Sequence, residues 1–158
     1  MEMSVQTTGI PEVIKTLDGL ADLVDAKLMA LLGAHAEVMI KLRTAEGRDV
    51  DGKMFAKYSP KYALFKQAKY SGPSYPNLFL TGDMLGAMNT KPQPSTEGHL
   101  TYKVVGSDTA VVYFPDAMQA AKASGNNAKR NFFSLSAAEI QELADEIIAE
   151  ITAREAML

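Results

Sequence analysis

The sequence has 158 residues, 47% of them hydrophobic and 22% charged, which predicts one globular domain and excludes an intrinsically disordered chain. It contains no cysteine, so a disulfide scaffold, a cysteine-based zinc site and a thiol nucleophile are excluded. The formal net charge of −3 gives no general attraction to DNA or to anionic lipid. We expect a single domain over residues 1–158, with residues 1–9 as an N-terminal arm that is flexible or ordered at an interface.

Neither a signal peptide nor a membrane span is predicted. Residues 1–15 lack a basic segment followed by a long apolar run, which a secretory signal requires. The most apolar stretch, residues 28–40, is interrupted by polar side chains and is too short to cross a bilayer. With no cysteine to oxidise, the chain suits folding in a reducing cytoplasm, and we expect no membrane contact.

A long amphipathic helix is predicted from Pro11 to about Gly47. Proline suits the first helical turn, where its missing N–H leaves no bond unmade. Apolar residues then recur with a 3.6-residue period over about nine turns. They are Ile10, Val13, Ile14, Leu17, Leu20, Ala21, Val24, Leu28, Leu31, Leu32, Val38, Met39 and Leu42. A helix of this length needs a partner surface, either from its own chain or from a neighbouring copy.

The middle of the chain is predicted to hold loops and two short helices. Residues 47–58 form a loop, and Ser59 with Pro60 is typical of the start of a helix, which we expect to end near Tyr70. A second short helix is expected over residues 82–88, followed by a polar, proline-rich connector over residues 91–98.

The last third predicts a β-hairpin between helices. Residues 99–105 alternate apolar and polar side chains, and residues 109–114 follow after a turn at Gly106, Ser107 and Asp108. Residues 116–129 begin as alanine-rich helix and end in a soft stretch, SGNNAK. Ser136 and Glu139 form a capping-box pattern that begins a C-terminal amphipathic helix. The apolar face of that helix comprises Ile140, Leu143, Ala144, Ile147, Ile148 and Ile151. The expected fold class is therefore α+β.

No catalytic, cofactor-binding or metal-binding pattern is found in the sequence. The two histidines, His35 and His99, are far apart, and the common nucleotide-binding, nucleophile-elbow and metal motifs are missing. We therefore expect a protein that is not an enzyme and that uses no cofactor.

Charge is unevenly distributed along the chain. Residues 48–70 carry a net charge of +4, and residues 139–158 carry −5. The simpler interpretation is a solvated surface. The alternative is that the two segments meet between neighbouring copies.

The basic segment 53–70 is also rich in aromatic residues, and this allows two interpretations. Lysines interleaved with Tyr58, Tyr62, Phe65 and Tyr70 resemble a surface that binds nucleic acid by stacking and phosphate contacts. However, Tyr58, Tyr62, Phe65 and Lys69 follow one helical face, which favours packing against the core.

Three segments resemble a family of phage virion morphogenesis and tail-completion proteins, of the phage Mu type. They are residues 51–66 (DGKMFAKYSPKYALFK), 77–88 (NLFLTGDMLGAM) and 128–140 (AKRNFFSLSAAEI), in the order and spacing of that family. Two departures are Met54, where the family commonly has proline, and residues 121–125, which replace a glycine- and histidine-rich turn.

The resemblance implies a ring-forming structural protein of the head–tail neck or tail end of a bacteriophage virion, assembled in the host cytoplasm. It implies a homo-oligomer, a hexameric ring or alternatively a dodecameric one, that joins head-closure, tail-terminator or tail-tube proteins. Genome DNA would pass through the ring without sequence-specific binding. The alternative function is a nucleic-acid-binding module that uses the lysine and aromatic stretch 53–70.

The subunit interface is expected where the charged segments lie. Phe132 and Phe133 are adjacent, and neighbouring side chains of an extended chain point in opposite directions. One ring is therefore expected to face a neighbouring copy, and the alternative is that both lie in the core. The expected interface residues are Lys53, Lys57, Lys61, Lys66, Lys69, Arg130, Phe132, Phe133, Glu139, Glu142 and Glu146.

Overall fold

A computed structural model describes residues 24–70, 73, 75–78, 84–86 and 99–156. The described residues form helices α2 (Ala26–Ala45), α3 (Pro60–Tyr70), α4 (Ala117–Arg130) and α5 (Ala137–Glu155), with strands β1 (Thr101–Val105) and β2 (Thr109–Tyr113). The predicted α+β class is confirmed. None of the helices in these ranges is long and apolar enough to cross a membrane.

The first described helix, α2, begins later than the sequence predicts. The backbone of Asp25 is extended, with φ −125° and ψ 171°, and its carboxylate accepts the Leu28 N–H at 2.8 Å. An unbroken helix from Pro11 to Gly47 is therefore wrong at Asp25, because this side chain caps a helix that starts at Ala26. Residues 10–23 lie outside the described residues. The predicted end is close, since Gly47 follows α2 with φ +74°.

The β-hairpin matches the sequence prediction. Strands β1 and β2 pair antiparallel, with Thr101 opposite Tyr113 and Val105 opposite Thr109. Gly106 opens the three-residue turn with φ +71°, a conformation that glycine adopts without strain. Gly33 of α2 lies against this hairpin, where an added Cβ would be 2.7 Å from the Tyr102 ring. The hairpin therefore packs closely on the middle of α2.

The last two helices are set by their caps. Asp116 caps α4, which continues through the expected soft stretch to Arg130 and ends at Asn131 with φ +37°. The predicted capping box of α5 is confirmed, because Ser136 Oγ accepts the Glu139 N–H and Glu139 Oε2 accepts the Ser136 N–H. Of the second predicted short helix only residues 84–86 are described, and they form a turn, while the connector 91–98 lies outside the described residues.

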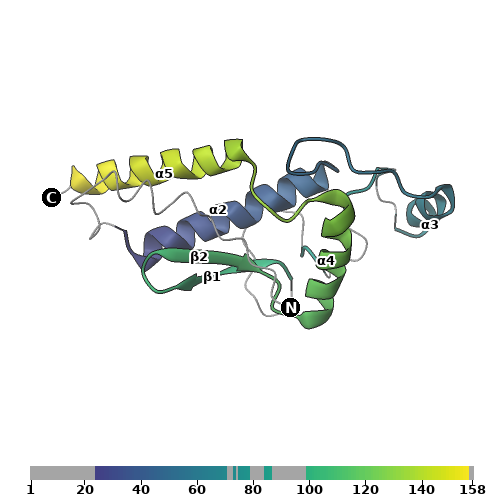
Figure 1. Cartoon of the computed structure of the whole chain (residues 1–158), viewed down its shortest axis with the longest axis horizontal. Coiled ribbons are helices and arrows are strands. Elements are labelled where there is room, and N and C mark those ends of the chain that lie inside the picture. Colours follow the sequence, from purple (N-terminus) through teal and green to yellow (C-terminus); the bar gives the residue numbers. More distant parts are fainter. Residues whose placement is uncertain (1–23, 71–72, 74, 79–83, 87–98, 157–158) are drawn as a thin grey trace.

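Helix α2 lies between the hairpin and α5, as Figure 1 shows. The core gathers side chains from all three, and Leu28, Met29, Leu32 and Ile40 of α2, Leu100 and Val112 of the hairpin region, and Leu143, Ile147 and Ile151 of α5 are buried. The apolar face of α5 is narrower than predicted, because Ile140 and Ile148 are exposed.

Two features of this fold were not expected from the sequence. Glu37 and Lys41 of α2 are fully buried and form an ion pair at 2.6 Å. Helix α3 projects from the body, at the end of the molecule opposite the C-terminus (Figure 1).

Candidate subunit interface

Helix α3 begins where Ser59 and Pro60 predict. The Ser59 carbonyl accepts the Ala63 N–H at 2.9 Å, and Pro60 occupies the first helical position. Only one side chain of this helix, Lys66, is buried. The helix is therefore attached to the body by few contacts, and most of its surface faces solvent.

The attachment of α3 depends on Lys66 and Tyr58. The Lys66 ammonium donates to Asn77 Oδ1 at 2.6 Å and lies 5.1 Å from the centre of the Tyr58 ring. The Arg130 guanidinium lies 5.7 Å from the same ring, so Tyr58 contacts two cations. Burial lowers the pKa of Lys66 and raises the pKa of Tyr58 from their ordinary values.

The side of α3 that faces away from Lys66 is apolar and basic. Its residues Lys61, Leu64, Phe65 and Ala68, which we call the α3 face, follow one another at i, i+3, i+4 and i+7 and are all exposed. Leu64 is 68% exposed and Phe65 is 45% exposed. Large apolar side chains at such exposure, next to one another on a projecting helix, are typical of a surface that binds a partner.

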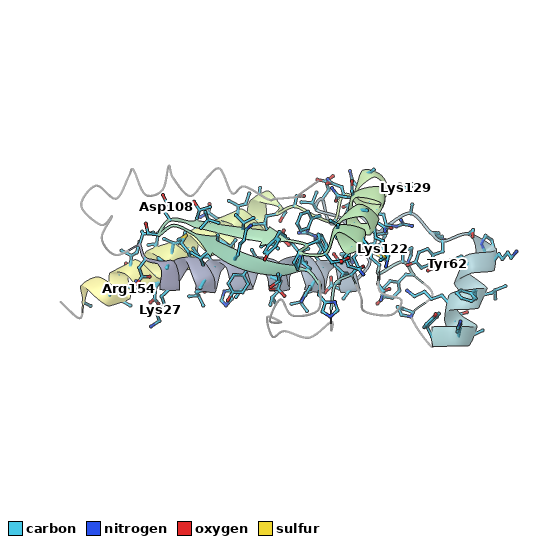
Figure 2. The ribbon with its side chains drawn as sticks, turned by 90° about the horizontal axis from the view of Figure 1, so that it is seen from below. Lys27, Tyr62, Asp108, Lys122, Lys129 and Arg154 are labelled. Carbon is cyan, nitrogen blue, oxygen red and sulfur yellow. The ribbon has the colours of Figure 1, made fainter. Side chains whose placement is uncertain are left out.

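The predicted core packing of Tyr58, Tyr62, Phe65 and Lys69 is therefore wrong for three of these residues. Tyr58 is half-buried, but Tyr62, Phe65 and Lys69 are exposed, and Tyr62 lies at the far end of the molecule (Figure 2). These rings pack on one another: the Tyr58 and Tyr62 centroids are 4.8 Å apart in an edge-to-face arrangement. The helix lies beyond the reach of the core, so local ring contacts replace core contacts.

The predicted basic residues do not act as one group. Lys53, Lys57, Lys61 and Lys69 are exposed, and Lys53 lies 3.6 Å from the Asp51 carboxylate. Lys66 is buried within its own chain, so its assignment to a subunit contact is wrong. Its stem and ammonium are used to attach α3.

The expectation that Phe132 or Phe133 faces a neighbouring copy is also wrong. Phe132 is 0% exposed and Phe133 is 5% exposed, and the Phe133 ring lies 5.1 Å from that of Phe114. The chain is not extended before this pair, because Asn131 is left-handed and Asn127 Oδ1 accepts the Phe133 N–H at 2.8 Å. This turn directs both rings into the core, so the alternative interpretation holds.

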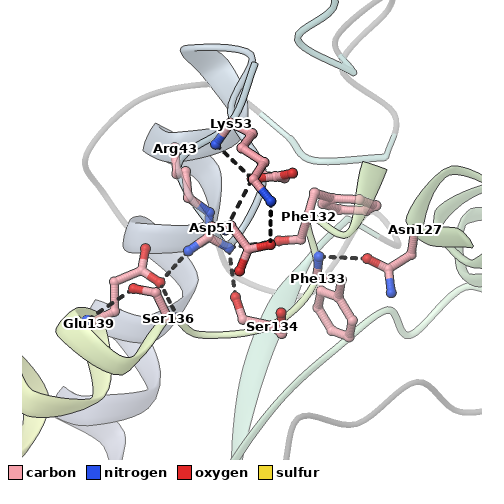
Figure 3. A network of polar contacts seen from close by, with 10 residues as sticks. Arg43, Asp51, Lys53, Asn127, Phe132, Phe133, Ser134, Ser136 and Glu139 are labelled. Carbon is pink, nitrogen blue, oxygen red and sulfur yellow. Dashed lines mark hydrogen bonds and ion pairs between the residues drawn. The ribbon is translucent and has the colours of Figure 1, made fainter. Parts of the chain in front are cut away.

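Arg43 of α2 holds the loop between α4 and α5, which contains Phe132 and Phe133, as Figure 3 shows. Its guanidinium donates to the carbonyl oxygens of Phe132 at 2.8 Å and Ser134 at 2.6 Å, and forms an ion pair with Glu139. Glu139 is therefore part of an intramolecular network, and its contacts require no neighbouring copy. Arg130 is half-buried and lies on the Tyr58 ring, so it too makes a contact within its own chain.

The remaining predicted acids lie along α5. Glu142 is exposed and has no charged partner among the described residues, and Glu146 lies 2.7 Å from His35 Nδ1 of α2. Glu150 forms an ion pair with Arg154, which also pairs with Asp25 at 3.1 Å. We call Glu142, Glu146 and Glu150 the acidic row, because their four-residue spacing places them on one side of α5.

Sequence reasoning missed Leu64 of α3 and the exposed leucines of α2. Leu31 is 37% exposed and Leu42 is 42% exposed, although both fall on the predicted apolar face. A signal was present in the sequence, since Leu31, His35, Val38 and Leu42 form a second stripe at helical spacing beside the one that is buried.

Comparisons of the chain with known protein families, with curated proteins and with solved structures find no match. Within the described ranges, no three histidine, aspartate or glutamate side chains are grouped as they would be around a metal ion.

Proposed function

We propose that this protein is a ring-forming structural component of a tailed bacteriophage virion, located at the head–tail neck or the tail end. The observation that carries the proposal is the α3 face, on which Leu64 is 68% exposed and Phe65 is 45% exposed. An exposed apolar helix of this kind gains free energy by docking on a partner.

Described residues of the three segments that resemble phage tail-completion proteins contact one another, and this supports the proposal. Tyr58 of the first segment contacts Arg130 of the third, and Lys66 of the first donates to Asn77 of the second. These two contacts attach α3 to the body through residues of all three segments. A shared role for them in holding a partner-binding helix is consistent with an assembly protein.

In this role the protein is a homo-oligomer, hexameric or alternatively dodecameric, that contacts head-closure, tail-terminator or tail-tube proteins in the virion. It uses no cofactor and performs no catalysis, and genome DNA passes through the ring without sequence-specific contacts. The resemblance supplies the ring symmetry.

Sizing with mass determination, together with negative-stain electron microscopy, tests this proposal. The expected result is a ring, formed by the purified chain or on addition of neck or tail proteins of the same phage. A chain that stays monomeric at high concentration and binds neither heads nor tails would overturn it. Flanking genes for portal, capsid and tail-tube proteins would support it independently.

A nucleic-acid-binding module is the second candidate function, and the exposure of the α3 aromatics favours it more than the sequence did. Tyr62 and Phe65 are exposed beside Lys61 and Lys69, an arrangement that suits stacking on bases and contact with phosphate. Binding of labelled DNA would weaken steeply with salt and be lost in a Lys57→Glu, Lys61→Glu, Lys69→Glu variant. Absence of salt-sensitive binding by the wild-type chain would exclude this candidate.

A further inference from the structure

A stripe of side chains on α2 faces away from the buried core, and together with the cavity at its N-terminal end we call it the α2 groove. Its floor is the stripe of Leu31, Val38 and Leu42, in which both leucines are exposed. At the N-terminal end of α2 the groove deepens into a cavity of about 320 Å³, where Leu31 and Ala34 meet Tyr102 of β1 and Glu150 of α5. The cavity therefore has an apolar floor, with β1 on one side and α5 on the other.

The wall formed by α5 is acidic. The contact between Glu146 and His35 places the acidic row beside the α2 stripe, because His35 belongs to that stripe. Lys27 and Arg154 lie at the far end of the cavity, and Arg154 is paired with Glu150 and Asp25. Glu142, which has no charged partner among the described residues, leaves a negative charge available at the other end of the row.

We propose that the α2 groove of one copy binds the α3 face of the next copy. This inference rests on the proposed homo-oligomeric function, and it names the two surfaces that meet. Leu64 and Phe65 cover the apolar floor, and Lys61 and Lys69 lie along the acidic row. This is recognition of an amphipathic helix by a groove, with anchors at i, i+3, i+4 and i+7.

The dimensions of the two surfaces match. Helix α3 has 11 residues, about 16 Å at 1.5 Å per residue, so it is long enough to lie along the stripe from Leu31 to Leu42, which spans about the same length of α2. Lys61 and Lys69 are as far apart along α3 as Glu142 and Glu150 are along α5. Both lysines can therefore meet carboxylates of the acidic row when α3 lies parallel to α5, and such pairs set orientation more than affinity.

The α3 face that binds there belongs to another copy, because α3 lies at the opposite end of its own molecule from the cavity. Figure 2 shows Tyr62 of α3 at one end of the molecule and Lys27 and Arg154, which line the cavity, at the other. A contact between two different surfaces is heterologous, and its repetition closes a ring when the rotation per copy divides the circle. The same geometry thus accounts for both the exposed helix and the ring.

The test uses two variants that each disable one surface. Leu64→Asp removes the α3 anchor and keeps the groove, whereas Leu31→Arg places a cation in the groove and keeps α3. Each variant alone should be a folded monomer by circular dichroism and sizing, with self-association weakened at least about tenfold. Their equimolar mixture should form a dimer and nothing larger, because one intact α3 face and one intact groove remain.

The outcomes that overturn the inference are distinct. If the wild-type chain assembles and Leu31→Arg assembles equally well, the groove is not the acceptor, and the proposed function stands. If Leu31→Arg alone forms dimers, two α3 helices pair with each other. If the wild-type chain stays monomeric, the proposed homo-oligomer fails as well.

A charge exchange tests the same contact should Leu31→Arg unfold. Glu142→Lys alters an exposed side chain and should weaken assembly, as should Lys61→Glu, while the double variant that carries both changes should recover it. Lys122→Glu on exposed α4 is the matched control and should assemble like the wild type. Failure of the double variant to recover assembly would place Lys61 and Glu142 in different contacts and overturn the inference.

Discussion

Arg43 of α2 forms an ion pair with Glu139 of α5, 96 positions later in the chain, and also donates to the carbonyl oxygens of the loop that precedes α5. Glu139 in turn accepts the Ser136 N–H and completes the capping box. One carboxylate thus joins the start of α5 to α2, and the contact is intramolecular. This separates Glu139 in function from Glu142, although the two lie three residues apart.

We predict that Glu139→Ala destabilises the monomer and that Glu142→Ala does not. The first change removes a cap and leaves Arg43 without its carboxylate, which costs about 1–3 kcal/mol of the free energy of unfolding. The second alters an exposed side chain and should change that free energy by less than about 0.5 kcal/mol. Urea denaturation measures both, and equal stabilities of the two variants would contradict the assignment.

The paired phenylalanines allow a second prediction about the core. Phe132→Ala and Phe133→Ala should each lower the free energy of unfolding by about 3–5 kcal/mol, because both rings are buried and their removal leaves a cavity. Loss of assembly in these variants would follow from loss of structure. Leu64→Ala is the control, since it should keep the circular dichroism spectrum and impair only assembly. A Phe132→Ala or Phe133→Ala variant that is folded but monomeric would show that the phenylalanine side chain belongs to a subunit interface.

Local signals in the sequence were sufficient for the elements that depend on neighbouring residues. The Gly106 turn, the Ser136 capping box and the Ser59–Pro60 helix start are each set within four residues, so the sequence predicts them correctly. The position of Asp25 could also have been recognised as a cap, but the apolar period that continues across it favoured an unbroken helix.

Contacts between distant segments were not predictable in this way. Whether Leu31 and Leu42 or Ala36 and Ile40 face inward depends on where the hairpin and α5 pack, since both pairs lie at helical spacing. Likewise, the burial of Lys66 depends on Asn77, and the inward direction of both phenylalanines depends on Asn127. The periodicity of one segment carries no information on these partners.

The cap of α2 predicts a dependence of stability on pH. The pKa of Asp25 lies below its ordinary value of 3.8, first because the carboxylate accepts the Leu28 N–H and then because Arg154 donates to it. A carboxyl group whose pKa is lowered by folding stabilises the protein above its unfolded pKa, and this contribution is lost as the pH falls below 3.8 through the folded pKa.

Asp25→Asn isolates this effect, because asparagine also caps helices but does not titrate. At neutral pH the wild type should be the more stable of the two, since only aspartate forms an ion pair with Arg154. The difference in free energy of unfolding should shrink as the pH is lowered below 3.8. Urea denaturation at several pH values measures it, and a difference that grows in acid would contradict the prediction.

The last prediction concerns copy number and uses the natural lack of cysteine in the chain. Ala68→Cys places a thiol on the α3 face, and Ala149→Cys places one beside Glu146 on α5; both positions are exposed. If α3 docks in the groove of the next copy, a short bis-maleimide should link the double variant into a ladder of covalent multimers. Each single variant should give almost no cross-linked product, and their mixture should give dimers only, because each copy then has one thiol. The highest rung of the ladder reports the number of copies in the closed ring, which we expect to be the hexamer. A ladder that stops at the dimer in the double variant would show a two-fold contact in place of a head-to-tail ring.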